Sequence, residues 1–275
     1  MQISISRYTV TTVLLVLVAG VVSWLLEATV GALPIEFFAF PMNLILMVLW
    51  LIAVVELYRA RSKNVIARYL LSAQATVWAI VFAAIGCLVV GLQSEPATQS
   101  YIFVLMVLYV MSVVAMVTLR GWRVQGTVRW RFLVSHLGLL FALVAGFWGA
   151  ADYQELRMIV DDTPRQQAIY IDGTAKKLDY TLRLAEFDVQ YNEAGVPEQY
   201  RADIEVDGNL VTLEVNDPYN VSFAQSIYLM NFERNDAATR LVVQIVYQPW
   251  RAVMVVGIVM LIVGALLMFL GGAKR

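Results

Sequence analysis

The chain has 275 residues, of which 60% are hydrophobic and only 15% are charged. Soluble globular proteins contain about 45–50% apolar and about 25% charged residues, so this composition, with a mean hydropathy of +0.69, excludes an ordinary soluble enzyme and indicates an integral membrane protein. A single cysteine and a single histidine exclude a disulfide framework and a histidine cluster, and a net charge of −1 argues against a nucleic-acid partner.

Six apolar stretches are long enough to cross a membrane, because a transmembrane helix needs about 20 mostly apolar residues. Tyrosine and tryptophan lie at many of their ends, as expected at a membrane interface. The first stretch is expected to be an uncleaved anchor, since its apolar run is long for a signal peptide and no A-x-A site follows it. The six predicted transmembrane helices cover residues 8–30, 40–58, 69–92, 101–119, 132–151 and 250–270.

The basic residues predict the orientation of these helices, because lysine and arginine stay on the cytoplasmic side. Loops 27–39 and 93–100 contain no lysine or arginine. Both termini are therefore predicted to be cytoplasmic, and residues 152–249 extracytoplasmic. The basic residues on the predicted inner side are Arg7, Arg59, Arg61, Lys63, Arg68, Arg120, Arg123, Arg129, Arg131, Lys274 and Arg275.

Residues 152–249 form a different kind of region, with 17 acidic and 8 basic residues. The dipeptide Asp207-Gly208 lies between two β-like stretches, residues 200–206 and 210–215, and is typical of a two-residue hairpin. We expect an extracytoplasmic antiparallel β domain, a sandwich or a small barrel, between the fifth and sixth helices, which divides the chain into 1–151, 152–249 and 250–275. Alternating, β-branched or aromatic stretches occur at residues 167–172, 180–191, 200–206, 210–215, 223–233 and 240–247.

His136 is the most conspicuous candidate for chemistry, because it lies four residues inside the fifth predicted helix. At 1.5 Å per residue this places it about 6 Å below the cytoplasmic edge of the hydrocarbon. Neutral imidazole is a common axial ligand of haem iron, and an apolar wall suits a porphyrin. The nearby leucines that could form such a wall are Leu133, Leu137, Leu139 and Leu140. The alternative is a histidine that only makes an interfacial or interhelical hydrogen bond.

Other candidates are weaker. Trp148 and Trp250, with Tyr153 and Tyr247, could stack against a porphyrin, although such residues more often anchor a protein at the membrane interface. Cys87 is expected to be structural. The sequence offers no catalytic residue and no metal ligand other than His136 for haem iron.

From the fifth helix onward, the chain resembles the ResB (CcsB) family of System II cytochrome c biogenesis proteins. The stretch "SHLGLLFALVAGFWGAAD" looks like the family's His-Leu-Gly helix, and "LAEFDVQYNEAGVPEQYRADIEV" looks like its strand, proline turn and following strand. "LEVNDPY" and "YQPWRAVMVVGIVMLIVGALLMFL" resemble its V-N-x-P turn and its last helix. The four motifs keep the family's order over residues 132–270.

The resemblance implies a multi-pass protein of the bacterial inner membrane that acts beside a CcsA-like membrane protein. Such a pair moves haem to the outer face and joins it to apocytochrome c. This chain would be an accessory subunit of the haem lyase complex and not catalytic alone. It would bind haem transiently through His136, with a weaker contribution from Trp148.

Two other functions are kept as alternatives. One is a purely structural partner that binds the apocytochrome without touching haem. The other is an envelope sensor or a transport subunit, although the few intramembrane polar residues, such as Gln74, give little support to an ion path.

Overall fold

A computed structural model describes residues 7–92, 99–195, 197–234 and 239–270. Lys274 and Arg275 of the predicted basic tail, and most of loop 93–100, lie outside the described residues. The chain divides into two compact units, one containing residues 1–151 and 253–275 and the other residues 152–252.

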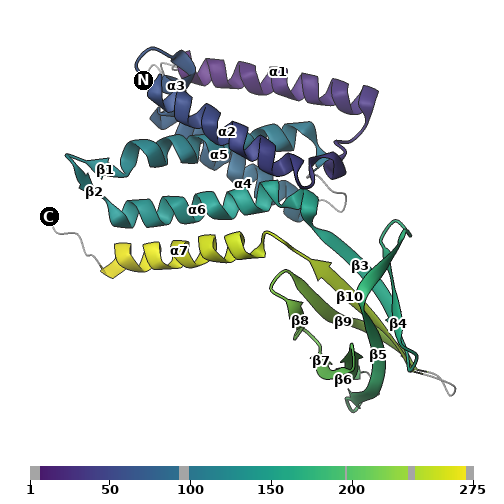
Figure 1. Ribbon diagram of the computed structural model, residues 1–275. Coiled ribbons are helices and arrows are strands. Elements are labelled where there is room, and N and C mark those ends of the chain that lie inside the picture. Colours follow the sequence, from purple (N-terminus) through teal and green to yellow (C-terminus); the bar gives the residue numbers. More distant parts are fainter. Residues whose placement is uncertain (1–6, 93–98, 196, 235–238, 271–275) are drawn as a thin grey trace. The chain divides into compact units, whose positions relative to one another are not determined.

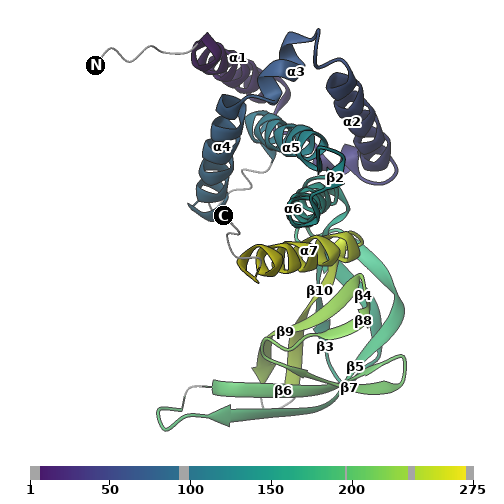
Figure 2. The ribbon, with the colours of Figure 1, turned by 90° about the vertical axis from the view of Figure 1, so that its left-hand side faces the viewer.

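The first unit is helical, and its helices are labelled in Figures 1 and 2. All the helices below except the short α3 are long and apolar enough to cross a membrane, which confirms the six predicted segments and a multi-pass membrane protein. At most a third of each apolar window is buried within the protein, so most of that surface is left to face lipid. The helices are α1 (Arg7–Val30), α2 (Met42–Arg59), α3 (Val65–Leu70), α4 (Ala73–Leu92), α5 (Tyr101–Gly121), α6 (Trp130–Trp148) and α7 (Arg251–Leu270).

The predicted start of the third transmembrane helix, at residue 69, is wrong. The chain instead forms the separate helix α3 and starts α4 at Ala73, after a break at residues 71–72. The break has a local cause, because the Ser72 hydroxyl accepts a hydrogen bond from the main-chain N–H of Ala75 at 3.1 Å and so begins a new helix. The apolar run alone could not show this break, since both helices are rich in apolar residues.

Helices α6 and α7 pack with their backbones in contact through two glycines. A Cβ atom on Gly138 would lie 2.8 Å from both the carbonyl oxygen of Gly257 and the main-chain nitrogen of Leu261. A Cβ atom on Gly257 would lie 2.7 Å from the main-chain nitrogen of Ala142. Small residues at a membrane helix interface permit this close approach, and Figure 1 shows the two helices side by side.

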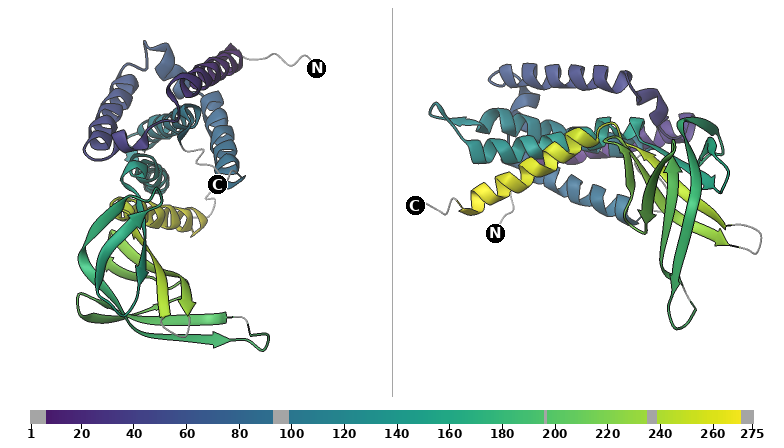
Figure 3. Two further views of the ribbon diagram at one scale, coloured as in Figure 1. Left: turned by 90° about the vertical axis from the view of Figure 1, so that its right-hand side faces the viewer. Right: turned by 60° about the horizontal axis from the view of Figure 1, so that its bottom comes forward.

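The second unit is one antiparallel sheet of eight strands in the order β7-β6-β5-β4-β3-β10-β9-β8. Figure 3 shows the strands of this sheet from two further directions. This confirms the antiparallel β prediction. It also confirms the predicted hairpin turn, since Asp207 and Gly208 have φ angles of 49° and 81°, as a type I′ turn requires. The strands are β3 (Gln154–Val160), β4 (Arg165–Tyr170), β5 (Ala175–Tyr191), β6 (Pro197–Val206), β7 (Asn209–Glu214), β8 (Tyr219–Ser222), β9 (Gln225–Arg234) and β10 (Thr239–Tyr247).

Four strands were not predicted from the sequence. β8 has only four residues, and β3 alternates buried Leu156 and Met158 with polar Arg157 in a stretch that also carries glutamine and glutamate. The other two, β1 (Arg123–Val124) and β2 (Thr127–Val128), form a small hairpin in the helical unit.

The sheet curls upon itself, because its two edge strands, β7 and β8, are consecutive in the chain. Only residues 215–218 join them, so the two edges must approach each other. The structure is therefore one sheet curled towards a barrel, and it is not a two-sheet sandwich. Its concave side holds the core, which includes Leu156, Met158, Val160, Leu182, Ile204, Leu213, Ile227, Leu241, Val243 and Ile245.

An ion pair between Asp161 and Arg165 stabilises the turn between β3 and β4. The Asp161 carboxylate accepts hydrogen bonds from Arg165 Nε at 3.0 Å and Arg165 Nη2 at 2.5 Å, and from the N–H of Thr163 at 3.1 Å. The hydrogen bonds from Arg165 lower the pKa of Asp161 below its usual value. The main-chain carbonyl of Asp161 in turn accepts from the N–H of Leu184 on β5 at 2.7 Å.

We predict that Asp161→Asn lowers the stability of the sheet by about 1–2 kcal/mol at neutral pH, since it weakens a two-pronged charged hydrogen bond. A carboxylate with a lowered folded-state pKa stabilises above its unfolded pKa of about 3.9, and this stabilisation is lost as pH falls through the folded-state pKa. The variant and wild type should therefore differ fully above the unfolded pKa and converge only once the pH is below the lowered folded-state pKa of Asp161. Thermal loss of β circular dichroism in the purified protein measures this, with exposed Asp179→Asn as the control. A variant difference that persists in acid would contradict the prediction.

We also predict that Gly138→Ala destabilises the packing of α6 on α7, because the added methyl group meets backbone atoms that cannot rotate away. The expected cost is about 1–3 kcal/mol. Gly20→Ala on α1 is the matched control, since nothing lies within 4 Å of its added Cβ atom. Thermal unfolding of the two variants in detergent should separate them, and equal melting temperatures would refute the predicted contact.

Candidate functional site

The sequence singled out His136, and the structure defines how its ring is held. Nδ1 lies 2.9 Å from the main-chain oxygen of Phe132, one turn earlier on α6. A carbonyl oxygen can only accept a hydrogen bond, so a neutral ring carries its proton on Nδ1 and leaves the lone pair on Nε2. Metal-binding histidines are commonly oriented in this way, by donating the other ring N–H to a carbonyl.

One aromatic ring packs on His136, and a cationic group lies over that aromatic ring. The Phe132 ring stacks on His136, with 3.8 Å between ring centroids and 25° between planes. The guanidinium carbon of Arg129 lies 5.0 Å from the centroid of Phe132. Leu140 is buried, whereas Leu139 is 37% exposed. These residues fit haem as one axial ligand, an apolar surround and a nearby cation suited to a propionate.

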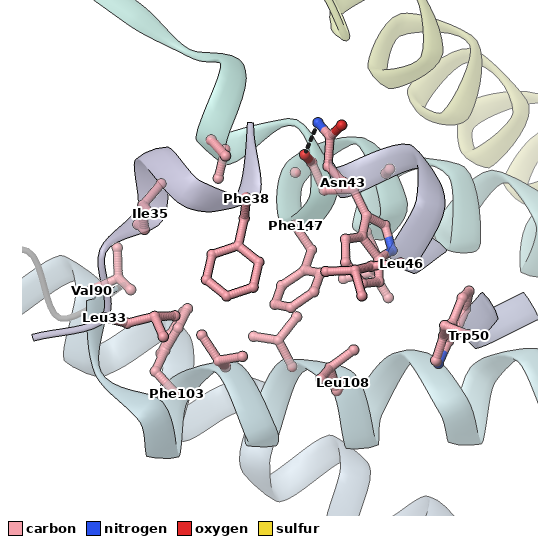
Figure 4. A pocket seen from close by; sticks show the side chains of 18 residues that line it. Leu33, Ile35, Phe38, Asn43, Leu46, Trp50, Val90, Phe103, Leu108 and Phe147 are labelled. Atoms are coloured by element: carbon pink, nitrogen blue, oxygen red, sulfur yellow. Dashed lines mark hydrogen bonds between the residues drawn. The ribbon is translucent and has the colours of Figure 1, made fainter. Parts of the chain in front are cut away.

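A second feature of the helical unit is an apolar cavity of about 610 Å³ (Figure 4). Figure 4 shows Phe38 and Phe147 extending into it. Its size is within the range of about 300–1,000 Å³ that is usual for small-molecule sites. The lining residues are Leu33, Ile35, Phe38, Asn43, Leu46, Trp50, Val90, Phe103, Val104, Val107, Leu108, Ala142, Leu143, Gly146, Phe147, Trp148, Ala150 and Ala151.

Three lining residues carry side-chain hydrogen-bonding groups, and two of these have their donors satisfied. The amide of Asn43, which is 1% exposed, donates to the main-chain carbonyl of Trp148 at 2.9 Å (Figure 4). The Trp50 indole donates to the hydroxyl of Ser112 at 3.0 Å. By contrast, the indole Nε1 of Trp148 is buried and has no hydrogen-bond partner among the described residues.

The structure does not bring His136 and Trp148 together. They are twelve residues apart on α6, which corresponds to about 18 Å along the helix axis. The cavity beside Trp148 is also unsuited to haem, since its lining residues include no axial ligand for iron and no cation for a propionate. Leu143 and Phe147 do lie on the helix face of His136, at positions i+7 and i+11.

The other predicted aromatic candidates lie in the β unit or at its ends. The Trp250 indole donates to the Asp152 carboxylate at 2.7 Å, so it joins the first residue of this unit to a residue near its end. The Tyr153 hydroxyl donates to Glu155 at 3.3 Å, and burial, followed by the charge of Glu155, raises the pKa of Tyr153. Tyr247 is 37% exposed at the end of β10.

Arg251, beside Trp250, strengthens the same junction. It donates to the Ser226 hydroxyl at 2.8 Å and to the side-chain oxygens of Asn220 and Gln248, both at 3.2 Å. Neither this arginine nor Asn43 was among the candidate residues predicted from the sequence. A polar residue at the start of an otherwise apolar helix was the available signal for Asn43.

Residues 126–244 match the ResB-like family, which confirms the predicted resemblance to ResB. The matched region includes His136 and Trp148 and nearly all of the β unit, but not the motif that begins α7. None of the curated proteins compared with this chain matches it.

Proposed function

From this family relationship, which points to cytochrome c biogenesis in general, we propose that the protein acts with a CcsA-like membrane protein. The pair would deliver haem across the bacterial inner membrane and attach it to apocytochrome c. In this proposal the chain is an accessory subunit of the haem lyase complex. The family match over residues 126–244 is the observation that carries the proposal, since it spans both α6 and the β unit.

The geometry of His136 supports a direct contact with haem. Its Nδ1–H is held by the Phe132 carbonyl, so the ring does not need to reorganise to present Nε2 to iron. Haem, when bound, supplies the iron porphyrin that is joined to the apocytochrome. The role of His136 is to hold and orient it, and Arg129 would offset the charge of a propionate.

The chain itself cannot complete a site with two histidine ligands, because His136 is its only histidine. The second ligand therefore comes from the CcsA-like partner. In the proposed topology residues 152–249 are extracytoplasmic, where the curled sheet is available to the partner or to the apocytochrome.

The proposed topology predicts opposite results for two fusions. Alkaline phosphatase folds only outside the cytoplasm, so it should be active when fused after Gly208 in the β6–β7 turn. It should be inactive when fused after Gly126 in the β1–β2 turn. Activities in the reverse order would exclude the proposed orientation.

The haem contact is tested with His136→Ala in the complex co-purified with the CcsA-like partner. We expect lower haem content, a changed absorption spectrum and reduced cytochrome c maturation, because iron loses one axial ligand. Added imidazole can fill the vacated position and should restore part of both the spectrum and the maturation.

Phe141→Ala, on the same helix, is the matched control and should leave all three readouts unchanged, because Phe141 is 36% exposed and is not one of the residues proposed to surround haem. Co-purification of the partner with His136→Ala shows whether the complex still assembles. An assembled His136→Ala complex with wild-type haem content, spectrum and maturation would favour the structural partner that does not touch haem.

A further inference from the structure

The link between α2 and α4 carries positive charge that the proposed function does not use. Residues 57–70 contain four basic and no acidic residues. Arg59 pairs with Glu56 at 2.6 Å, whereas the other three basic residues of the link have no ion-pair partner among the described residues. These three residues, all exposed, are Arg61, Lys63 and Arg68, and we call them the basic patch.

Helix α3, in the middle of this link, exposes two large apolar residues beside the basic patch. The side-chain oxygen of Asn64 begins the helix, since it accepts hydrogen bonds from the N–H groups of Ile66 at 2.8 Å and Ala67 at 3.2 Å. Ala67 and Leu70 are buried and attach α3 to the rest of the unit, but Val65 and Ile66 are 62% and 60% exposed. The surface of the link therefore combines cations with apolar side chains.

The link must lie at the membrane surface. It is short, because α2 ends at Arg59 and α4 begins at Ala73, and both helices are long and apolar enough to span the membrane. Arg120, near the end of α5, donates to the main-chain carbonyl of Leu71 at 2.5 Å and so fixes the link to a third such helix. Figure 1 shows α3 and the β1–β2 hairpin at the same end of the helical unit. Residues 120–131 at this end add four more basic and no acidic residues.

We propose that the basic patch and α3 together bind anionic phospholipids. The negatively charged headgroup lies against Arg61, Lys63 and Arg68, and the upper part of an acyl chain contacts Val65 and Ile66. Clusters of lysine and arginine directly beside a membrane-spanning helix attract anionic lipids in this way. Such a site selects the lipid by its charge, because the exposed cations of the patch have no carboxylate to neutralise them among the described residues.

Other acidic molecules fit these residues less well. A soluble phosphate compound would use the cations but would leave Val65 and Ile66 exposed to water. An acidic segment of a partner protein would have to displace the lipid headgroups that surround a link at the membrane surface. The positive-inside rule accounts for the side of the membrane on which the basic residues lie, but it predicts no preference of the folded protein for one lipid over another.

The test compares two lipids that have the same acyl chains and different headgroup charge. The full-length protein in detergent is incubated with equal amounts of dioleoyl phosphatidylglycerol, which is anionic, and dioleoyl phosphatidylcholine, which is zwitterionic. Retained lipid is then measured by native mass spectrometry. We expect wild type to retain the anionic lipid about tenfold better or more, since each cation near an anionic surface contributes an effect of about fivefold.

Replacing all three residues of the basic patch by glutamine should remove most of this preference and leave retention of phosphatidylcholine unchanged. Lys63→Gln alone should lower the preference about fivefold, so the test does not depend on the triple variant. The matched control makes the same change in net charge on the β unit, at three exposed residues, and should keep the wild-type preference. Its substitutions are Arg157→Gln, Lys177→Gln and Arg201→Gln.

Equal retention of the two lipids by wild type, or a preference that the triple variant keeps, would overturn the proposal. So would an equal loss of preference in the control variant, which would show an effect of net charge alone. Glycerol 3-phosphate at the concentration of the lipid should not displace phosphatidylglycerol, and displacement would indicate a site for soluble phosphates instead. The readout needs neither haem nor the CcsA-like partner, so it is independent of the outcome at His136.

Discussion

Polar groups of the helical unit need hydrogen-bond partners within the protein, because the surrounding lipid is apolar. Helix α6 shows this constraint most clearly. A helix leaves its last carbonyls without partners, and lipid offers none. Asn43 on α2 donates to the carbonyl of Trp148, the last residue of α6. His136 similarly uses its Nδ1–H on a carbonyl of its own helix. The indole of Trp148 is the exception among the described residues, since its buried Nε1 has no hydrogen-bond partner.

Different faces of α6 carry different tasks. Gly138 and Ala142 form a narrow face that lets α7 approach to backbone contact. His136 lies on another face, which continues to Leu143 and Phe147 at the cavity. A helix can combine these tasks because its 3.6-residue period separates them around its circumference. Because α7 packs against Gly138 and Ala142, the face of α6 that carries His136 is not part of the α6–α7 interface.

The β unit is subject to a different constraint. Its sheet must close while the chain continues into a helix at each end of the unit. The short link between β7 and β8 brings the sheet edges together, and the buried alternate residues fill the concave side. The bond from Trp250 to Asp152 and the bonds from Arg251 to Ser226 and Asn220 hold the two ends of the unit. Trp250, in the last of the four motifs, therefore contributes to holding the ends of this unit together.

The sequence by itself determined the six apolar segments, the antiparallel β character, the Asp207-Gly208 turn and the resemblance to the ResB family, because these depend on local composition, on period and on short motifs. It also singled out His136, since a lone histidine in an apolar run is visible without a structure. Tertiary structure decided the break before Ala73, the curled single sheet, the bond that orients His136 and the cavity with its unpaired Trp148 indole. These depend on atoms from residues far apart in the chain, such as Asn43 and Trp148, and hydrophobic periodicity does not specify which such residues meet.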